Sequence, residues 1–365
     1  MPSLFSKPTL WLLLLCLSCK NQPPSTSNTF TTDTGNKIIF LDSIAASHTI
    51  IRDTAEQFFE QIGILDMSLQ MKKKIPLTHS REEVLKEYKT FLQSEVTDFS
   101  PTERAFVEKA MKKVYADCQA LSPSLLPDRL RLIKTHANHY GSTAFYTREN
   151  AVVIPKQVLE QANQKAFSEV MIHELFHIYS RMHPAVRKEL YASIGFAPIG
   201  GVQQLAIPDS LRQRILLNPD GIDFAQAIQV TDQSERTFFA IPIINANEFS
   251  YHSNKLNFFD YLQFHLFEIT PPSDQLRTVK THSDGSSTVD AQAIKDFHHQ
   301  IKDNTDYIIH PDEILADNFL YVVRSENNPA YAQRFSPAGQ QLLKELRRIL
   351  LQAQTLTRPS PANAH

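Results

Sequence analysis

The residues best suited to chemistry stand together in one pentapeptide, His173-Glu174-Leu175-Phe176-His177. If this segment is helical, His173 and His177 lie one turn apart on the same face, and both imidazoles can reach one metal ion. Glu174 then lies beside them, where it can take a proton from a metal-bound water. Two nitrogen ligands, a carboxylate base and an open coordination position are the minimum equipment for zinc-assisted hydrolysis.

The neighbours of the pentapeptide favour a metal site over a chance match. With 14 histidines in 365 residues, a chance match or a structural polar cluster is the competing interpretation. Two histidines and a glutamate rarely occupy apolar surroundings unless something satisfies their polar atoms, and a metal ion does so. The apolar neighbours at helical spacing are Phe167, Val170, Met171, Leu175, Phe176 and Ile178.

A helix and a small sheet are expected to position the pentapeptide. The sequence predicts a helix from Lys165 to about Met182, which Pro184 limits. Alternating and β-branched runs before it predict strands. These strands are Arg129–Lys134, Thr143–Thr147 and Ala151–Ile154.

The rest of the chain predicts an α+β fold. Residues 39–125 form a helical N-terminal region, with capping boxes at Ser80–Glu83 and Ser100–Glu103 that open two of its helices. Residues 126–357 form the catalytic region and end in a mostly helical part. Its further expected elements are strands at Thr237–Ile244 and Phe258–Ile269 and a helix from Ser336 to about Gln354.

A strand pair that leads into a metal-bearing helix resembles the zincin metallopeptidases. In that family an edge strand beside the zinc pairs with the substrate backbone, and the resemblance makes Gly141–Thr147 the expected edge strand. Downstream, Pro311 suits a first helical position, and Glu313 and Asp317 stand at i and i+4. This pair resembles the E-x-x-x-D element of gluzincins. The resemblance implies that Glu313 is the third zinc ligand and that Asp317 orients a ligand histidine, His173.

The gluzincin resemblance has one large departure and one rival. Glu313 lies much farther beyond the pentapeptide than in the best-known gluzincins, so residues 185 to about 305 are expected to form an insertion. His183 is the rival ligand, because it holds the last position of the metzincin pattern H-E-x-x-H-x-x-G-x-x-H. Ser180 stands where that pattern has the glycine that lets the chain turn back to the metal. The last methionine is Met182, so the methionine turn of metzincins cannot follow.

A tyrosine or histidine often stabilises the oxyanion in zincins. The candidates in this chain are Tyr321, His252 and Tyr251, and Tyr321 lies one helical turn beyond Asp317. A packed aromatic or a surface pair is the alternative role for each of them.

The N-terminal end of the chain indicates export. Residues 1–18 join a positive charge to a short apolar run, as in a secretory signal peptide. Leu17-Ser18-Cys19 resembles a bacterial lipobox, so Cys19 is expected to carry lipid, and an ordinary cleaved signal is the alternative. Residues 19–38 are assigned to the lipidated cysteine and a flexible tether, and residues 358–365 to a disordered tail. Lys20 favours the outer membrane of a diderm bacterium, by resemblance to lipoprotein sorting rules.

Charge and cysteine content narrow the function further. A net charge of −2 gives no indication of a nucleic-acid partner. Cys118 is the only cysteine beyond the signal region, so no intramolecular disulfide is expected. The sequence therefore predicts an exported, membrane-anchored zinc metallopeptidase, in which zinc and Glu174 activate water against a peptide or protein substrate. Two alternatives remain open: a non-catalytic metal-binding lipoprotein that acts as a scaffold, and a metal enzyme of non-peptidase type.

Overall fold

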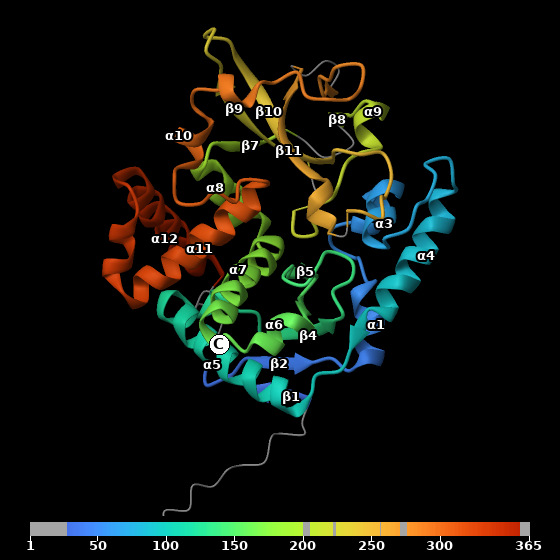
Figure 1. Cartoon of the computed structure of the whole chain (residues 1–365). Coiled ribbons are helices and arrows are strands. Elements are labelled where there is room, and N and C mark those ends of the chain that lie inside the picture. The colour runs from blue at the N-terminus through green and yellow to red at the C-terminus, as the bar shows by residue number, and fades with distance from the viewer. Residues whose placement is uncertain (1–27, 200–204, 222–223, 256, 271–275, 358–365) are drawn as a thin grey trace, which may run out of the picture.

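A computed structural model describes residues 28–199, 205–221, 224–255, 257–270 and 276–357 (Figure 1). The fold is α+β, as the sequence predicts. The expected signal peptide with Cys19 and the expected tail 358–365 lie outside the described residues. Within the described ranges, no helix combines the length and the apolar character needed to cross a membrane.

The first sheet is mixed and carries the strands that precede the pentapeptide. Its order is β1-β2-β4-β6-β5, with β3 paired to β4. The strands β2, β4 and β6 run parallel, while β5 pairs antiparallel with β6 and forms one edge of the sheet. A strand is present in each of the three expected places, but β5 begins only at Tyr146, so residues 141–145 of the expected edge strand are not a strand. The strands are β1 (Thr29–Thr31), β2 (Lys37–Phe40), β3 (Val96–Thr97), β4 (Arg129–Thr135), β5 (Tyr146–Arg148) and β6 (Ala151–Pro155).

Two of these strands lie where the sequence indicates a tether. In residues 19–38 and just beyond, β1 and β2 form an antiparallel hairpin in which Thr29 faces Ile39. The parallel pairing of β2 with β4 adds this hairpin to the sheet. The polar composition concealed β1 because it is an exposed edge strand in which only Phe30 packs onto the core. The range assigned to the tether therefore contains ordered strands from Thr29 onward.

The segment 185–305, expected as an insertion, builds a second sheet. This antiparallel sheet has the order β11-β10-β9-β7, and a short parallel pair, β8 with β12, forms a separate two-stranded sheet beside the end of β11. The strand expected from Phe258 begins as a turn of 3-10 helix and becomes a strand only at Leu262. The strands are β7 (Phe196–Pro198), β8 (Leu205–Ala206), β9 (Gln226–Thr231), β10 (Thr237–Ala246), β11 (Leu262–Ile269) and β12 (Arg277–Thr278).

Helices surround the sheets, and the structure confirms the N-terminal caps that the sequence predicts for two of them. Ser80 caps α4 by accepting a hydrogen bond from Glu83 N, which is one half of the capping box predicted there, and Ser100 with Glu103 forms the complete capping box predicted on α5. The first part of the expected helical N-terminal region, up to residue 71, is divided into the separate short helices α1, α2 and α3. The helices are α1 (Ser43–Ile50), α2 (Phe58–Gln61), α3 (Ile64–Gln70), α4 (Arg81–Ser94), α5 (Pro101–Leu121), α6 (Lys156–Gln161), α7 (Gln164–Met182), α8 (Pro184–Ser193), α9 (Asp209–Arg212), α10 (Phe297–Ile301), α11 (Pro311–Asn327) and α12 (Pro337–Thr357). Short 3-10 turns lie at Pro123–Leu125, Phe258–Tyr261, Ala291–Ala293 and Pro329–Arg334.

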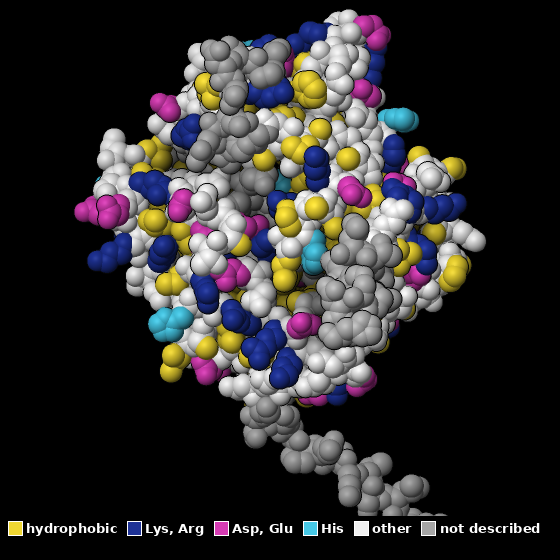
Figure 2. Space-filling view, turned by 180° about the vertical axis from the view of Figure 1, so that it is seen from behind, with side chains coloured by type: hydrophobic (Ala, Val, Ile, Leu, Met, Phe, Trp, Pro, Cys, Tyr) yellow, Lys and Arg dark blue, Asp and Glu magenta, His cyan; other side chains and the backbone are white. Residues whose placement is uncertain are grey.

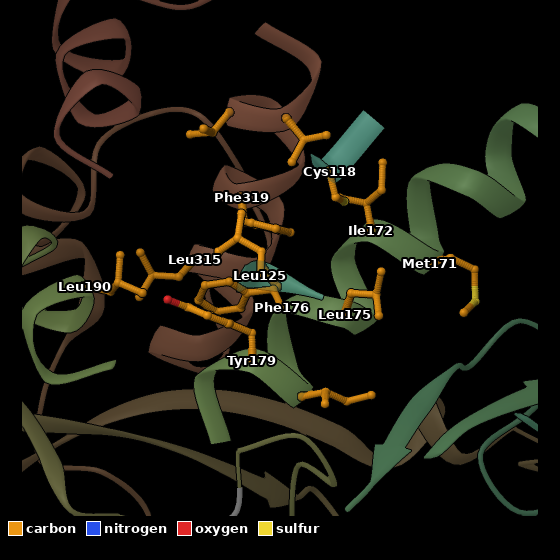
Figure 3. Packing of buried hydrophobic residues seen from close by; sticks show 14 of the residues in the cluster. Cys118, Leu125, Met171, Ile172, Leu175, Phe176, Tyr179, Leu190, Leu315 and Phe319 are labelled. Carbon is orange, nitrogen blue, oxygen red and sulfur yellow. The ribbon is translucent and has the colours of Figure 1, made fainter. Parts of the chain in front are cut away.

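The helix that carries the pentapeptide, α7, lies between the two sheets, with α11 alongside it and α12 packed on α8 and α11 (Figure 1). Its apolar face packs on α5 and α11 in one core, in which Phe176 meets Phe319 at 5.5 Å between ring centroids (Figure 3). Cys118 of α5 is buried in the same core. The N-terminal helical region therefore shares a core with the rest of the chain. On the outside, charged residues of both signs are interspersed with apolar ones over the face shown in Figure 2.

Candidate metal centre

Three potential metal ligands converge from two helices that are distant in the sequence. His173 and His177 project from one face of α7, and Glu313 projects from the first turn of α11. Glu313 Oε2 lies 3.0 Å from His173 Nε2 and 3.4 Å from His177 Nε2. One ligand atom from each residue falls within 4.8 Å of the other two, as a shared cation requires.

Two aspartates of α11 fix the orientation of the histidines. His173 Nδ1 donates to Asp317 Oδ1 at 2.9 Å, and His177 Nδ1 donates to Asp312 Oδ2 at 2.7 Å. With Nδ1 protonated, Nε2 of each neutral ring keeps its lone pair for a metal. The structure thus places Asp317 beside His173, as the sequence implied, and adds Asp312 for His177. Asp312 was missed in the sequence analysis because an acidic residue in the first turn of a helix is explained by the helix dipole alone.

The orienting carboxylates are themselves held by hydroxyl groups. Asp312 Oδ1 accepts hydrogen bonds from Ser180 Oγ at 2.6 Å and from the Tyr191 hydroxyl at 2.8 Å. Asp317 Oδ2 accepts one from Thr305 Oγ1 at 2.5 Å. Ser180, which stands at the glycine position of the metzincin pattern, therefore supports a histidine through Asp312 and does not redirect the chain.

Glu313 is anchored from the segment that was expected to be an insertion. Asn218 Nδ2 donates to Glu313 Oε1 at 2.7 Å, which leaves Oε2 facing the two histidines. Asn218 lies in the loop 216–221, between α9 and the second sheet. Leu217 N in this loop donates to Asp66 Oδ2 of α3 at 2.8 Å. Sequence reasoning gave no signal for this contact, because nothing local marks an asparagine far from the motif.

Glu174 has the placement expected of a base. Its side chain is buried, and among the described residues its Oε2 has no hydrogen-bond partner. Burial raises the pKa of Glu174 to about 8, and the neighbouring Asp220 carboxylate adds to the effect. A buried carboxylate oxygen without a donor is costly unless a cation, a water or a substrate satisfies it.

The charges of the cluster fit a cation. Burial alone lowers the pKa of His173, but its hydrogen bonds to Asp317 and Glu313 raise that pKa to about 10. The pKa of Glu313 is held well below its usual range: burial opposes ionisation, and the charge of His177 and hydrogen bonds from both histidines outweigh it. These carboxylates create a strong demand for positive charge that a divalent metal ion would meet. Two neutral imidazoles and one carboxylate are a donor set that suits zinc.

A cavity of about 370 Å³ opens over the cluster. Its floor contains both histidines and Glu174, and its walls are mainly apolar. Thr143, Ala144 and Phe145, which precede the edge strand β5, line it on one side. The apolar residues of the other walls include Leu216, Leu217, Ile244, Phe258 and Leu262. Cavities that combine apolar walls with a few convergent polar groups are typical of ligand sites.

The structure does not bring the other predicted residues to the cluster. His183 ends α7, where its Nδ1 faces Tyr179 O at 2.9 Å and its ring stacks on Tyr179. The exposed His252 lies near Glu248, and Tyr321 packs on Phe335 at 4.8 Å between centroids. None of these three belongs to the lining of the cavity. Tyr251 is likewise absent from that lining and packs near Tyr261.

Two tyrosines that the sequence reasoning passed over, Tyr140 and Tyr307, line the cavity. Tyr140 is buried, and its hydroxyl accepts a hydrogen bond from Gln70 Nε2 at 3.1 Å. Tyr307 precedes α11, and its ring centroid lies 6.2 Å from that of His173. Its sequence position, a few residues before the Glu313 helix, was the only available signal. Tyr307, whose ring lies beside that of His173, therefore takes the place of Tyr321 and His252 as the tyrosine or histidine candidate beside the cluster.

Comparisons with protein-family models, with curated proteins and with solved structures each return no match for the chain. The geometry of the cluster and its cavity therefore carries the functional argument.

Proposed function

We propose that this protein is a zinc-dependent metallopeptidase of the zincin type, with the gluzincin ligand set His173, His177 and Glu313. One observation carries the proposal: the two histidines of α7 and the distant Glu313 converge on one point beside the buried Glu174, whose Oε2 has no hydrogen-bond partner within the described ranges. A purely structural metal site has no need for a buried carboxylate of this kind.

Each residue has a defined role in the proposed reaction. When bound, zinc would supply Lewis-acid chemistry, polarising a carbonyl group and making water more acidic. Glu174 accepts the proton of the attacking water and transfers it to the leaving amine. Tyr307 donates a hydrogen bond to the oxygen that gains charge. The segment 143–145, which lines the cavity and leads into the edge strand β5, offers backbone groups to an extended peptide.

The proposal extends to location. The sequence features at residues 1–38 support export and attachment to a membrane through lipidated Cys19, with the outer membrane favoured in a diderm cell. Metabolic labelling with a fatty acid tests this part, and a Cys19→Ala variant should lose the label.

The test of the enzymatic proposal uses protein purified from Lys20 onward. We expect near one zinc per chain by elemental analysis and peptide hydrolysis that a chelator abolishes. Glu174→Gln should retain zinc and lose hydrolysis by a factor of about 100 or more. Glu313→Ala should lose zinc, while His183→Ala should keep it. A Glu326→Gln variant, at the far end of α11 and paired there with Arg347, is the matched control. Intact activity in Glu174→Gln would refute the mechanism, and absence of zinc would refute the site.

A further inference from the structure

A carboxylate with no part in the proposed zinc binding faces the same cavity. Asp220 is 7% exposed, lines the cavity, and has an oxygen within 4.8 Å of ligand atoms of Glu174 and His177. Its Oδ1 accepts hydrogen bonds from Thr147 N at 2.7 Å and from the Thr147 hydroxyl. Arg181 Nη2 in turn donates to Thr147 Oγ1 at 2.8 Å. This chain of donors fixes the carboxylate from behind and leaves its Oδ2 free of Thr147.

The neighbour of Asp220 indicates that a ligand belongs there. Glu174 is 4% exposed, and its Oε2 has no hydrogen-bond partner in the part of the chain that the structure describes. When both of these buried carboxylates are ionised they repel each other, and a cation between them removes the repulsion without a proton on Glu174. His177 does not supply this charge once zinc is bound, because its Nδ1 donates to Asp312 and its Nε2 is a zinc ligand. The charge of Arg181 favours ionised Asp220, but Arg181 Nη2 donates to Thr147 Oγ1, on the side away from Glu174. The pair is therefore suited to a separate cationic group.

An ammonium group matches this pair. It carries three N–H donors and no acceptor, so it can bond to Asp220 and Glu174 together. The position of Glu174 determines whether this is the α-ammonium group or the side-chain ammonium group of a substrate. Glu174 acts beside the carbonyl group that is attacked, so the ammonium group that it contacts must lie close to that carbonyl group. An α-nitrogen is two bonds, or about 2.5 Å, from the carbonyl carbon of its own residue. The end of a lysine side chain lies several ångström farther away and would not fit between the two carboxylates.

The charge of the cavity also determines which end of a peptide fits. The lining includes five carboxylates, those of Glu169, Glu174, Asp220, Glu313 and Asp317, and no lysine or arginine among the described residues. A C-terminal carboxylate would find no cationic partner there except the zinc itself. An N-terminal ammonium group is complementary to this lining.

We propose that Asp220 binds the α-ammonium group of a peptide, so that the site removes the first residue of a chain. The inference rests on the proposed hydrolytic function and gives it a substrate class. Water adds across the first peptide bond: hydroxide joins the carbonyl carbon, the C–N bond breaks, and Glu174 carries the proton to the leaving amine. The apolar wall formed by Leu216, Ile244 and Phe258 receives an aliphatic or aromatic side chain of that first residue.

The experiment compares a leucine-first peptide with its N-acetylated form on the zinc-loaded wild type. We expect release of leucine from the free peptide and cleavage of the acetylated one slower by a factor of 10 to 100. Asp220→Asn keeps an oxygen for both Thr147 donors and loses only the charge. It should lower kcat/KM for the free peptide by the same factor and leave the acetylated peptide nearly unchanged. Asp209→Asn, whose side chain is 91% exposed, is the control.

Calorimetry with leucinamide and N-acetyl-leucinamide on the same zinc-loaded proteins separates this inference from the proposed function. Tighter binding of the free amine that Asp220→Asn abolishes supports the ammonium site, even if no peptide is cleaved and the proposed hydrolysis fails. Equal cleavage of both peptides, cleavage at internal bonds, or no preference in binding would overturn the inference. The wild-type comparison decides the matter if Asp220→Asn does not fold.

Discussion

Replacing Asp312 with asparagine is the most direct test of how the histidines are held. Asp312 is buried, with 3% of its side chain exposed, and its carboxylate receives the His177 N–H and two hydroxyl groups. Asparagine keeps one oxygen for His177, and its amide N–H groups can donate to the oxygens of Ser180 and Tyr191. The substitution therefore removes the charge that strengthens His177 as a ligand and preserves the packing.

The expected size of the effect follows from this arrangement. Loss of an orienting carboxylate weakens metal binding by about 10- to 100-fold, or about 1.4 to 2.7 kcal/mol. Asp317→Asn should weaken binding less, because 21% of the Asp317 side chain is exposed and water screens its charge. Asp312→Ala should behave differently, since it leaves three buried donors without an acceptor. Each such donor costs about 1 to 3 kcal/mol, so this variant loses folding stability as well as zinc affinity.

Zinc affinity measured by competition with a chelator at fixed pH checks the prediction, with urea unfolding of the metal-free proteins alongside. Glu326→Gln on the same helix serves as the control. Zinc affinity of Asp312→Asn equal to that of the control would refute the reasoning. The reasoning would also be refuted if Asp317→Asn lost more zinc affinity than Asp312→Asn, because the more buried carboxylate would then contribute less to zinc binding.

Three further predictions follow from other parts of the structure. Tyr307→Phe should lower kcat by about 10-fold or more with little change in KM, since the hydroxyl is used in the transition state; steady-state kinetics would contradict this if KM alone changed. Burial raises the pKa of Asp66 from 3.8 to about 7, so its contribution to stability is complete below pH 4 and is lost as the pH rises toward 7. Asp66→Asn should remove that decline, which amounts to about 4 kcal/mol at 1.36 kcal/mol per pKa unit, and parallel pH profiles of urea unfolding for both proteins would disprove it. Phe176→Ala should cost about 3 to 5 kcal/mol of unfolding free energy, because the ring is buried against Phe319; a loss below 1 kcal/mol in urea unfolding would show that the two helices dock by other contacts.

Local patterns account for the parts of the fold that the sequence predicts well. The helix of the pentapeptide, the capped helices α4 and α5 and the strands β4 and β6 all rest on spacing or capping within a few residues. Where the local pattern was weak, the prediction differed from the structure. The exposed threonines of β1 resemble a flexible tether, and they were assigned to one from the sequence. The second sheet was incompletely foreseen because its pairing joins segments far apart in the chain.

The sequence by itself determined which side chains could bind a metal and where the two helices that carry them begin. His173, Glu174 and His177 follow from helical spacing, and Glu313 with Asp317 from a resemblance in motif. Only the tertiary structure decided which residues meet. Packing of α7 on α11 brings Asp312 to His177, and the loop 216–221 brings Asn218 to Glu313 and Asp220 toward Glu174. It also moved His183, His252 and Tyr321 out of consideration as parts of the cluster. The physical reason is that spacing governs contacts within one element, whereas contacts between elements depend on how their apolar faces pack.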